Sequence, residues 1–445
     1  MTEQLQYEAS YLPLGPFKVR FPFIHYKVEK VEFIQGIILG ATALSATVYL
    51  MDALGVSYDL AYNLVIFETS LYMLHVLLGD PVIPGWITAS LPLTLVYLAD
   101  FQMGSERIQA LAALQILVGI IFVVMGITGF AKKFVGLVPS SIKGAILMAA
   151  PISVLQGQLS DTGGMHTYPI ALLAGFLSLV IISYSTFYAK LRKKYKIFDL
   201  IGKYGNLFPY LIAMVVGLLI GELSPNPVEW GSIIHLPNLK FVFGQMSVFT
   251  NGFPPVSFFL RAFPLALIIY IISFGDFITS QSLVKDAKTE RDDEIVDFNE
   301  NRSNLIVGFR NLLLGTLAPF PPMAGPLWAG MMVSTTQRYK EGKGAMDTLI
   351  GGMGSFRIAT FLCVMILPLT SFLKPVFAVG GAITLMFQAI VSGRIGLDFC
   401  ENDLDRLIAP FTAAVIAFAG SGWGLLVGFA LNFILGNISM NELKK

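Results

Sequence analysis

The sequence predicts an all-α integral membrane protein, and two properties of the chain support this fold class. Of its 445 residues, 55% are hydrophobic and only 13% are charged, whereas an ordinary soluble protein carries roughly 25% charged residues. The apolar residues also form runs of about 17 to 25, the length that crosses a bilayer as a helix. Examples are Phe33 to Leu50, Ile108 to Phe130 and Phe411 to Leu435. The core of a soluble protein cannot bury this much apolar surface.

Charge and motifs exclude several functional classes. The formal net charge is +1, so we expect no nucleic acid or other polyanionic partner. Cys363 lies in an apolar span and Cys400 in a polar loop, a placement that predicts neither a disulfide nor a thiol-metal site. The sequence carries no phosphate-binding loop, metal-spaced His/Cys cluster or nucleophile-base motif, so we predict no cofactor, no metal and no enzymatic activity.

Fourteen membrane spans are expected, in two sets of seven. The first set lies near residues 33–53, 58–78, 83–99, 108–130, 140–158, 168–189 and 206–222. The second set lies near residues 258–283, 302–317, 322–336, 346–370, 374–392, 405–419 and 421–438.

The distribution of basic residues supports this count and its orientation. The first thirty residues contain no cleavable signal, so we expect the amino terminus to stay in the cytoplasm. Connections after even-numbered spans then face the cytoplasm, as the positive-inside rule requires of basic loops. The basic residues of these connections are Lys132, Lys133, Lys190, Arg192, Lys193, Lys194, Lys196, Lys203, Lys285, Lys288, Arg291, Arg338, Lys340 and Lys343.

An odd number of spans in each half has a topological consequence. Two seven-span repeats must lie in opposite orientations, which is the inverted-repeat plan of many secondary transporters. We therefore expect a multi-pass protein of the inner (plasma) membrane, surrounded by lipid, with both termini in the cytoplasm. Its expected parts are a cytoplasmic segment 1–32, repeats 33–222 and 258–438, a linking external loop 223–257 and a cytoplasmic tail 439–445.

Prolines interrupt spans 3 and 10, which occupy the same place in the two halves. The sequences are GDPVIPGWITASLP from position 79 and PFPPMAGPLWAG from position 319. Proline lacks an N–H donor and clashes with the preceding turn, so each segment is expected to be extended first and helical only afterwards. Each half-helix then begins near mid-membrane, with free N–H groups and the positive end of its dipole. Such paired interruptions indicate a transporter's binding site; simple kinks in packed helices are the alternative.

The second broken span also resembles a known family. Residues 302–335 resemble the ninth and tenth spans of the nucleobase-ascorbate transporters, which include the bacterial uracil and xanthine permeases. Gly330 and Thr335 match the family signature, whereas Leu327 and Trp328 replace its leading polar residue and its Asn. Sulfate permeases and benzoate symporters are similar in architecture. The resemblance implies the uracil-permease-like fold, a homodimer and a nucleobase as substrate, or a divergent relative that shares the fold with sulfate permeases.

Two intramembrane acids are candidates for cation coupling. Asp276 lies in a long apolar stretch, where an ionised carboxylate costs about 2.5 to 3.5 kcal/mol on insertion scales, and the resemblance places it at a family acidic position. We predict that Asp276 binds the coupling cation or the substrate; a structural hydrogen bond is the alternative. Glu68 is the second candidate, and His75, seven residues later, shares roughly its helix face. Asp80 is expected to cap or pair near the surface.

The starts of the half-helices supply the predicted substrate-binding residues. Trp86 and Trp328 stand there, where indole rings could stack on a planar solute; an interfacial aromatic belt is the alternative. Thr88 and Ala329 adjoin them. Other polar residues that could line the site, or equally join helices, are Gln35, Ser273, Thr279 and Ser280.

These observations favour a secondary active transporter. The leading hypothesis is a proton-coupled symporter of a small planar or anionic solute such as a nucleobase, with sodium as the other possible coupling cation. An inorganic or carboxylic anion transporter is the alternative, favoured by the loss of polar residues at Leu327 and Trp328. A channel would need a continuous polar stripe, and a membrane enzyme would need an intramembrane cluster of His, Asp or Ser.

Overall fold

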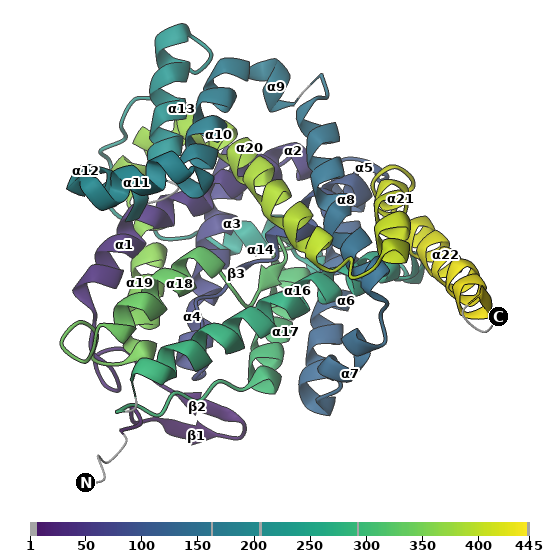
Figure 1. Ribbon diagram of the computed structural model, residues 1–445. Coiled ribbons are helices and arrows are strands. Elements are labelled where there is room, and N and C mark those ends of the chain that lie inside the picture. Colours follow the sequence, from purple (N-terminus) through teal and green to yellow (C-terminus); the bar gives the residue numbers. More distant parts are fainter. Residues whose placement is uncertain (1–6, 162, 204–206, 292, 443–445) are drawn as a thin grey trace, which may run out of the picture.

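The computed structural model describes residues 7–161, 163–203, 207–291 and 293–442, and most of these residues are helical (Figure 1). The helices of the first half are α1 (Lys30–Gly40), the short 3-10 helix η1 (Ala41–Ser45), α2 (Ala46–Leu54), α3 (Tyr58–Leu71), α4 (Met73–Leu77), the 3-10 helix η2 (Thr88–Ser90), α5 (Leu91–Ala99), α6 (Ser105–Thr128), α7 (Ala131–Gly136), α8 (Ser140–Gln158), α9 (Gly164–Thr167), α10 (Pro169–Tyr184), α11 (Thr186–Lys194), α12 (Lys196–Lys203) and α13 (Leu207–Ile220).

The helices of the second half are α14 (Leu239–Met246), α15 (Val248–Asn251), α16 (Val256–Glu290), α17 (Glu300–Leu317), α18 (Ala329–Lys340), α19 (Leu349–Met365), α20 (Leu367–Asp398), α21 (Asp403–Ala419) and α22 (Ser421–Glu442). Among the described residues, four short strands form two antiparallel pairs. They are β1 (Leu12–Leu14) with β2 (Phe17–Val19), and β3 (Gly85–Trp86) with β4 (Ala324–Gly325).

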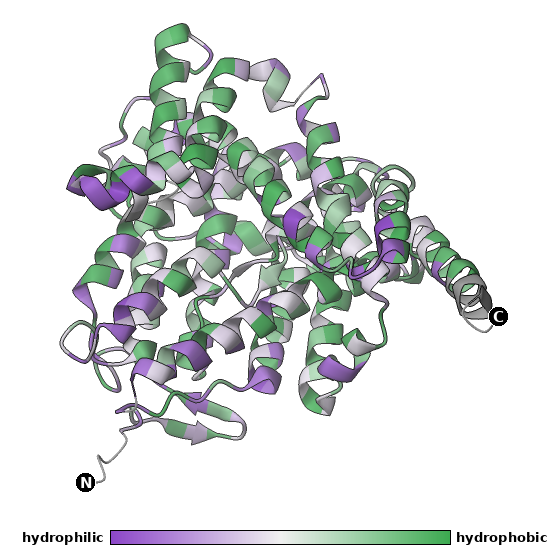
Figure 2. Cartoon of the chain, viewed as in Figure 1, coloured by the Kyte–Doolittle hydropathy of each residue, from purple (hydrophilic) through white to green (hydrophobic). Residues whose placement is uncertain are grey.

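The molecule is a multi-pass membrane protein by the length and composition of its helices. Among the described residues, five helices are long and apolar enough to cross a membrane, and six if the bent pair α10–α11 is one span. Most of the long helices carry largely hydrophobic residues in Figure 2, as lipid contact requires. Exposed apolar side chains include Ile127, Leu177, Leu219, Leu407 and Phe433. The count of fourteen spans and the inverted repeat stay predictions.

Two helices are longer than the spans expected from the sequence. α16 has 35 residues and α20 has 32, so both extend well beyond the expected spans. The expected first span agrees with one continuous helical stretch, Lys30–Leu54, in which η1 joins α1 to α2. α14 and α15 lie within the expected linking segment 223–257. α22 extends to Glu442, and positions 443–445 of the expected tail lie outside the described residues. Hydropathy locates apolar length, but it does not report where a helix ends.

Helices α6 and α17 cross with their backbones in contact, and this crossing fixes the start of the second broken segment. A Cβ atom added at Gly119 would lie 2.9 Å from the amide nitrogen of Leu312, and one at Gly308 would lie 2.9 Å from that of Val123. Only glycine permits this approach, which is a common way for membrane helices to pack. The C-terminal end of α17 is thereby held in the interior, where β4 follows.

The amino-terminal segment packs on the loop between α16 and α17. Tyr7 forms a parallel β-bridge with Glu294. The Glu294 carboxylate accepts a 3.0 Å hydrogen bond from the amide of Leu349, at the start of α19. Arg291 binds Asp293 and also donates to the Met346 carbonyl at 3.0 Å. The loop after α16 therefore connects the amino-terminal segment to the start of α19.

Glu294 should make stability depend on pH. Burial raises the pKa of this carboxyl from 4.5 to about 7, despite opposing hydrogen bonds from Leu349 and Tyr339. The folded state therefore binds this proton more tightly than the unfolded state, and the stabilisation is lost as pH rises from 4.5 to about 7. Glu294→Gln should raise the melting temperature at pH ~8 and flatten its pH dependence in this window. Identical pH profiles for both proteins would contradict this assignment.

Candidate functional site

Strands β3 and β4 join the two broken segments at the centre of the molecule. Gly85 pairs with Gly325 and Trp86 with Ala324. The pairing continues on both sides: the Ile87 amide donates to Met323 at 2.8 Å and the Trp328 amide donates to Ile83 at 2.6 Å. The prolines on either side remove donors and prevent a helix, so the remaining backbone groups pair across the two segments.

Glycine is required at this pairing. A Cβ atom at Gly85 would lie 2.8 Å from the Leu327 carbonyl oxygen, and one at Gly325 would lie 3.0 Å from the Ile87 amide nitrogen. Beyond the pairing, α5 has nine residues and α18 has twelve. The prediction of half-length helices preceded by extended residues is confirmed for both segments, and their position at mid-membrane stays a prediction.

A buried polar network holds the second extended segment against α17. The Arg310 Nη1 group donates to the Gly325 carbonyl at 3.0 Å. Asn311 donates to the Ala324 carbonyl at 2.9 Å and accepts from the Ala324 amide at 3.0 Å. Every one of these side chains is fully buried. Buried backbone N–H and C=O groups must be paired. Arg310 and Asn311 therefore form hydrogen bonds with backbone groups of the extended segment, which lack the partners that a helix would provide.

Glu68 and His75 both meet Arg310. Glu68 forms an ion pair with Arg310 Nη2 at 3.3 Å, and His75 Nε2 lies 3.2 Å from Arg310 Nη1. Arginine only donates, so His75 Nε2 accepts and its proton lies on Nδ1, 2.8 Å from Asp80. Asp80 also accepts from Ser303 at 2.6 Å. Asp80 therefore pairs, as expected, and its side chain is fully buried within the protein.

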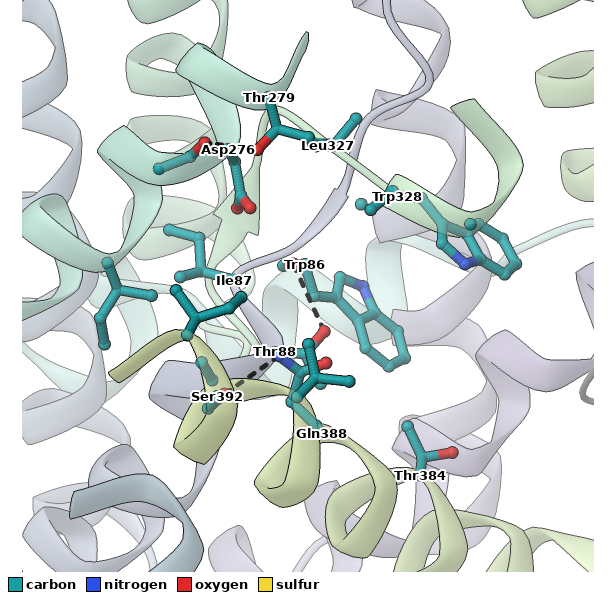
Figure 3. Close-up of a pocket in the computed structure, with 18 of the residues that line it drawn as sticks. Trp86, Ile87, Thr88, Asp276, Thr279, Leu327, Trp328, Thr384, Gln388 and Ser392 are labelled. Carbon is teal, nitrogen blue, oxygen red and sulfur yellow. Dashed lines mark hydrogen bonds between the residues drawn. The ribbon is translucent and has the colours of Figure 1, made fainter. Parts of the chain in front are cut away.

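A cavity of about 950 Å³ lies between the starts of the two half-helices (Figure 3). Asp276 and Thr279 of α16 face Gln388 and Ser392 of α20 across it, and Trp86 lies between. The predicted substrate-binding residues that line it are Trp86, Thr88, Asp276, Trp328 and Ala329.

The other predicted site residues lie away from the cavity lining. Gln35 and Ser273 are absent from the cavity wall, as are Glu68 and Ser280. Ser273 and Ser280 are fully buried on α16, so they sit on the sides of the helix that pack in the protein. Closeness to Asp276 in the sequence therefore does not predict that a polar residue lines the cavity. Of Ser273, Thr279 and Ser280, Thr279 alone lines it.

Asp276 presents an acid to the cavity. Its side chain lines the wall and points into the open space in Figure 3. Within the part of the chain that the structure describes, this carboxyl has no hydrogen bond or ion pair. The alternative of a structural hydrogen bond to a neighbouring helix is therefore not supported.

Arg357 of α19 is the residue that our sequence reasoning missed. It lines the cavity, is 1% exposed, and its Nε and Nη2 atoms have no hydrogen-bond partner among the described residues. Its guanidinium lies 4.2 Å from the Tyr72 ring centre and 5.2 Å from that of Trp328. Arg357 interrupts an apolar stretch just as Asp276 does, so the rule that intramembrane charges are functional candidates could have found it.

The two arginines next to Tyr72 differ in their partners. Arg310 lies 4.9 Å from the Tyr72 ring centre and has Glu68 as its counter-ion. Arg357 forms no hydrogen bond or ion pair with a carboxylate within the described ranges, and Glu68 acts on it only from a longer distance. Aromatic faces stabilise a cation only in part, so Arg357 remains a buried positive charge with free donors at the cavity wall. Such a group is suited to bind an anion.

Comparisons with known proteins support the fold. No protein-family model matches the sequence, and no curated protein matches it at a significant level. The transmembrane domain of a cyanobacterium bicarbonate transporter, BicA, is a similar solved structure, with 12% identity and a TM-score of 0.51; 91% of this chain and 98% of that chain are covered.

Two structures of SLC26A9 are also similar. One has 16% identity and a TM-score of 0.55, over 92% of this chain and 66% of that chain. The other is the murine Solute Carrier 26 family member A9 anion transporter in the inward-facing state. It has 13% identity and a TM-score of 0.53, over 92% of this chain and 68% of that chain. This chain thus spans about two thirds of SLC26A9. At these identities the likeness shows a membrane-transporter fold, and it does not support the nucleobase-ascorbate family.

Glu68 should act as a structural counter-ion. Glu68→Leu would leave the buried Arg310 unpaired, and breaking such a pair costs about 3–5 kcal/mol, so the melting temperature in detergent should fall sharply. Glu68→Gln retains an acceptor for Arg310 and should cost less. A Glu68→Leu protein with wild-type stability but without concentrative uptake would contradict the structural role and restore Glu68 as the coupling acid.

Proposed function

We propose that this protein is a secondary active transporter that carries a small anion together with a cation. The observation that carries the proposal is Arg357, a buried guanidinium without a carboxylate partner at the wall of the central cavity. A buried charge without a partner is costly, and an entering anion would relieve this cost. We propose transport rather than catalysis because the fold resembles solved membrane transporters.

The start of α18 supports anion binding from a second direction. Ala329 and Gly330, in its first turn, line the same cavity as Arg357. The first N–H groups of a helix have no partner within the helix and carry the positive end of its dipole. A small anion held between these amides and Arg357 would meet two fixed positive groups.

Asp276 explains why binding of the anion would be coupled to binding of a cation. Asp276 and Arg357 carry opposite charges at the wall of one cavity, which Lys132 and Lys143 also line. An anion bound in this low-dielectric cavity would be repelled by an ionised Asp276. Binding of a cation at Asp276, either a proton or sodium, removes this repulsion. We therefore propose that anion and cation bind together.

The paired broken segments support a mechanism of alternating access. Each half of the chain contributes one extended strand and one half-helix to the cavity, as two inverted repeats would. We propose fourteen spans in two inverted seven-span repeats, with one group of helices rocking against the other around the cavity. A homodimer and cytoplasmic termini in the inner membrane complete this proposal.

A planar solute such as a nucleobase is the second candidate, because Trp86 and Trp328 line the cavity. Both rings already pack on protein aromatics: Trp86 lies 5.8 Å from Phe320 and Trp328 lies 5.6 Å from Phe356. Neutral nucleobases would also leave the charge of Arg357 uncompensated. The anion hypothesis is therefore preferred, and nucleobases serve as comparison ligands in the experiment below.

Arg357→Gln should abolish anion recognition. A hydrogen bond to a charged group contributes about 1.5–3 kcal/mol, or roughly 10- to 100-fold in affinity. Thermal shifts of the purified protein with bicarbonate, sulfate, benzoate and uracil give the measurement, because a ligand that binds the folded state raises its stability. Arg406→Gln, at an exposed arginine, is the matched control. An anion that stabilises wild type and Arg357→Gln equally, or stabilisation by uracil alone, would refute the anion site.

Asp276→Asn should separate binding from coupling. The amide resembles the neutral carboxylic acid and cannot exchange a cation, so anion-induced thermal stabilisation should persist while uphill accumulation in proteoliposomes is lost. The dependence of uptake on the imposed pH or sodium gradient should disappear as well. Concentrative, gradient-dependent uptake by the Asn variant would show that Asp276 is not the coupling group.

A further inference from the structure

Helices α11 and α12 lie between two apolar helices, α10 and α13. The chain turns by 70° between α10 and α11, so α11 cannot continue in the direction of α10. α12 then leads back to α13, which begins at Leu207. In Figure 1 the two short helices project together at the left, next to the ends of α10 and α13. A basic segment that turns away from one apolar helix and leads back to the next is typical of a segment that runs along the membrane surface.

The α11–α12 segment is strongly basic. Figure 2 shows hydrophilic residues gathered there, beside the apolar α10 and α13. Its one acidic residue, Asp199, forms a 3.3 Å ion pair with Arg192. The remaining basic side chains that the structure describes on this segment are exposed, namely Lys190, Lys193, Lys194 and Lys196. The segment therefore carries an excess of positive charge at the surface that the positive-inside rule assigns to the cytoplasm.

The same segment also exposes large apolar side chains. Phe187 is 68% exposed, Tyr195 46% and Ile197 58%. This exposure does not result from loose folding, because Tyr188 is buried and donates a 2.8 Å hydrogen bond to the Phe198 carbonyl, which fixes α12 on α11. A segment with both apolar and basic side chains suits the boundary between acyl chains and headgroups.

We infer that α11–α12 binds anionic lipid headgroups of the cytoplasmic leaflet. Phe187, Tyr195 and Ile197 enter the acyl boundary, while the lysines extend to the phosphates through their flexible stems. Clusters of this size on a membrane-surface helix attract anionic lipid. A soluble polyanion would satisfy the lysines but would leave the three apolar side chains in water.

This surface is connected to the cavity through packing. Residues of α10, α13 and α20 form one apolar cluster, which includes Leu172, Ala213 and Ile383. The hydroxyl groups of Tyr210 and Thr384 lie 2.6 Å apart, and Thr384 lines the cavity. Lipid bound at α11–α12 therefore holds the helices that form one wall of the cavity. The inference does not depend on the proposed function, because the lipid surface exists whatever the cavity carries.

The test measures thermal stability of the full-length protein in mixed micelles with phosphatidylglycerol or phosphatidylcholine. Phosphatidylglycerol should raise the melting temperature of wild type by several degrees, and phosphatidylcholine should not. Lys193→Gln/Lys194→Gln should lose about half of this rise, and roughly 0.5 M salt should suppress it. Lys133→Gln/Lys285→Gln removes two exposed lysines elsewhere and should retain the whole rise.

Three outcomes would overturn the inference. They are an equal rise with both lipids, an undiminished rise in Lys193→Gln/Lys194→Gln, and a rise that inorganic phosphate reproduces. A spin label on Phe187→Cys gives a second measurement in nanodiscs, with buried Cys363 and Cys400 as background. The label should be more accessible to oxygen than to a water-soluble nickel chelate; accessibility equal to that of a label in water would also refute membrane contact.

Discussion

The antiparallel pairing of β3 with β4 is the contact on which the rest of the site depends. Gly85 and Gly325 lie opposite each other, at a separation that a side chain at either position would prevent. Extended backbone inside a membrane is tolerated only where its polar groups are paired within the protein. The two segments satisfy one another, and α5 and α18 can therefore begin in the interior. Both half-helix starts reach one cavity because their preceding strands are bonded together.

The charged residues around this contact divide into two groups with different roles. Arg310, Glu68, His75 and Asp80 form a buried network whose hydrogen bonds lead to Gly325. Such a network supports the strand, and none of these four side chains lines the cavity. Arg357 and Asp276 instead line the cavity. A transporter needs both groups, because a binding charge is useful only if the backbone around it is held in place.

The structure adds partners to individual side chains. Glu68, a candidate for coupling, and Asp80, expected to cap or pair, both belong to the buried network. Gln35 and Ser273 were expected in the lining and lie outside it. The spacing of Glu68 and His75 predicted that they lie on the same helix face, and both do contact Arg310. It could not identify Arg310 as their partner, because this residue lies more than two hundred positions later in the chain.

The sequence by itself determined the membrane class, most helix positions and the two broken segments. These follow from local physics: apolar length, and prolines that cannot continue a helix. Trp86, Trp328 and Asp276 were also predicted from the sequence as cavity residues, because each is unusual within its own segment. Only the tertiary structure decided that β3 pairs with β4, that Glu68 neutralises Arg310 and that Arg357 has no carboxylate partner among the described residues. A charge acquires its role from the charges packed around it, and these come from helices that are distant in the chain.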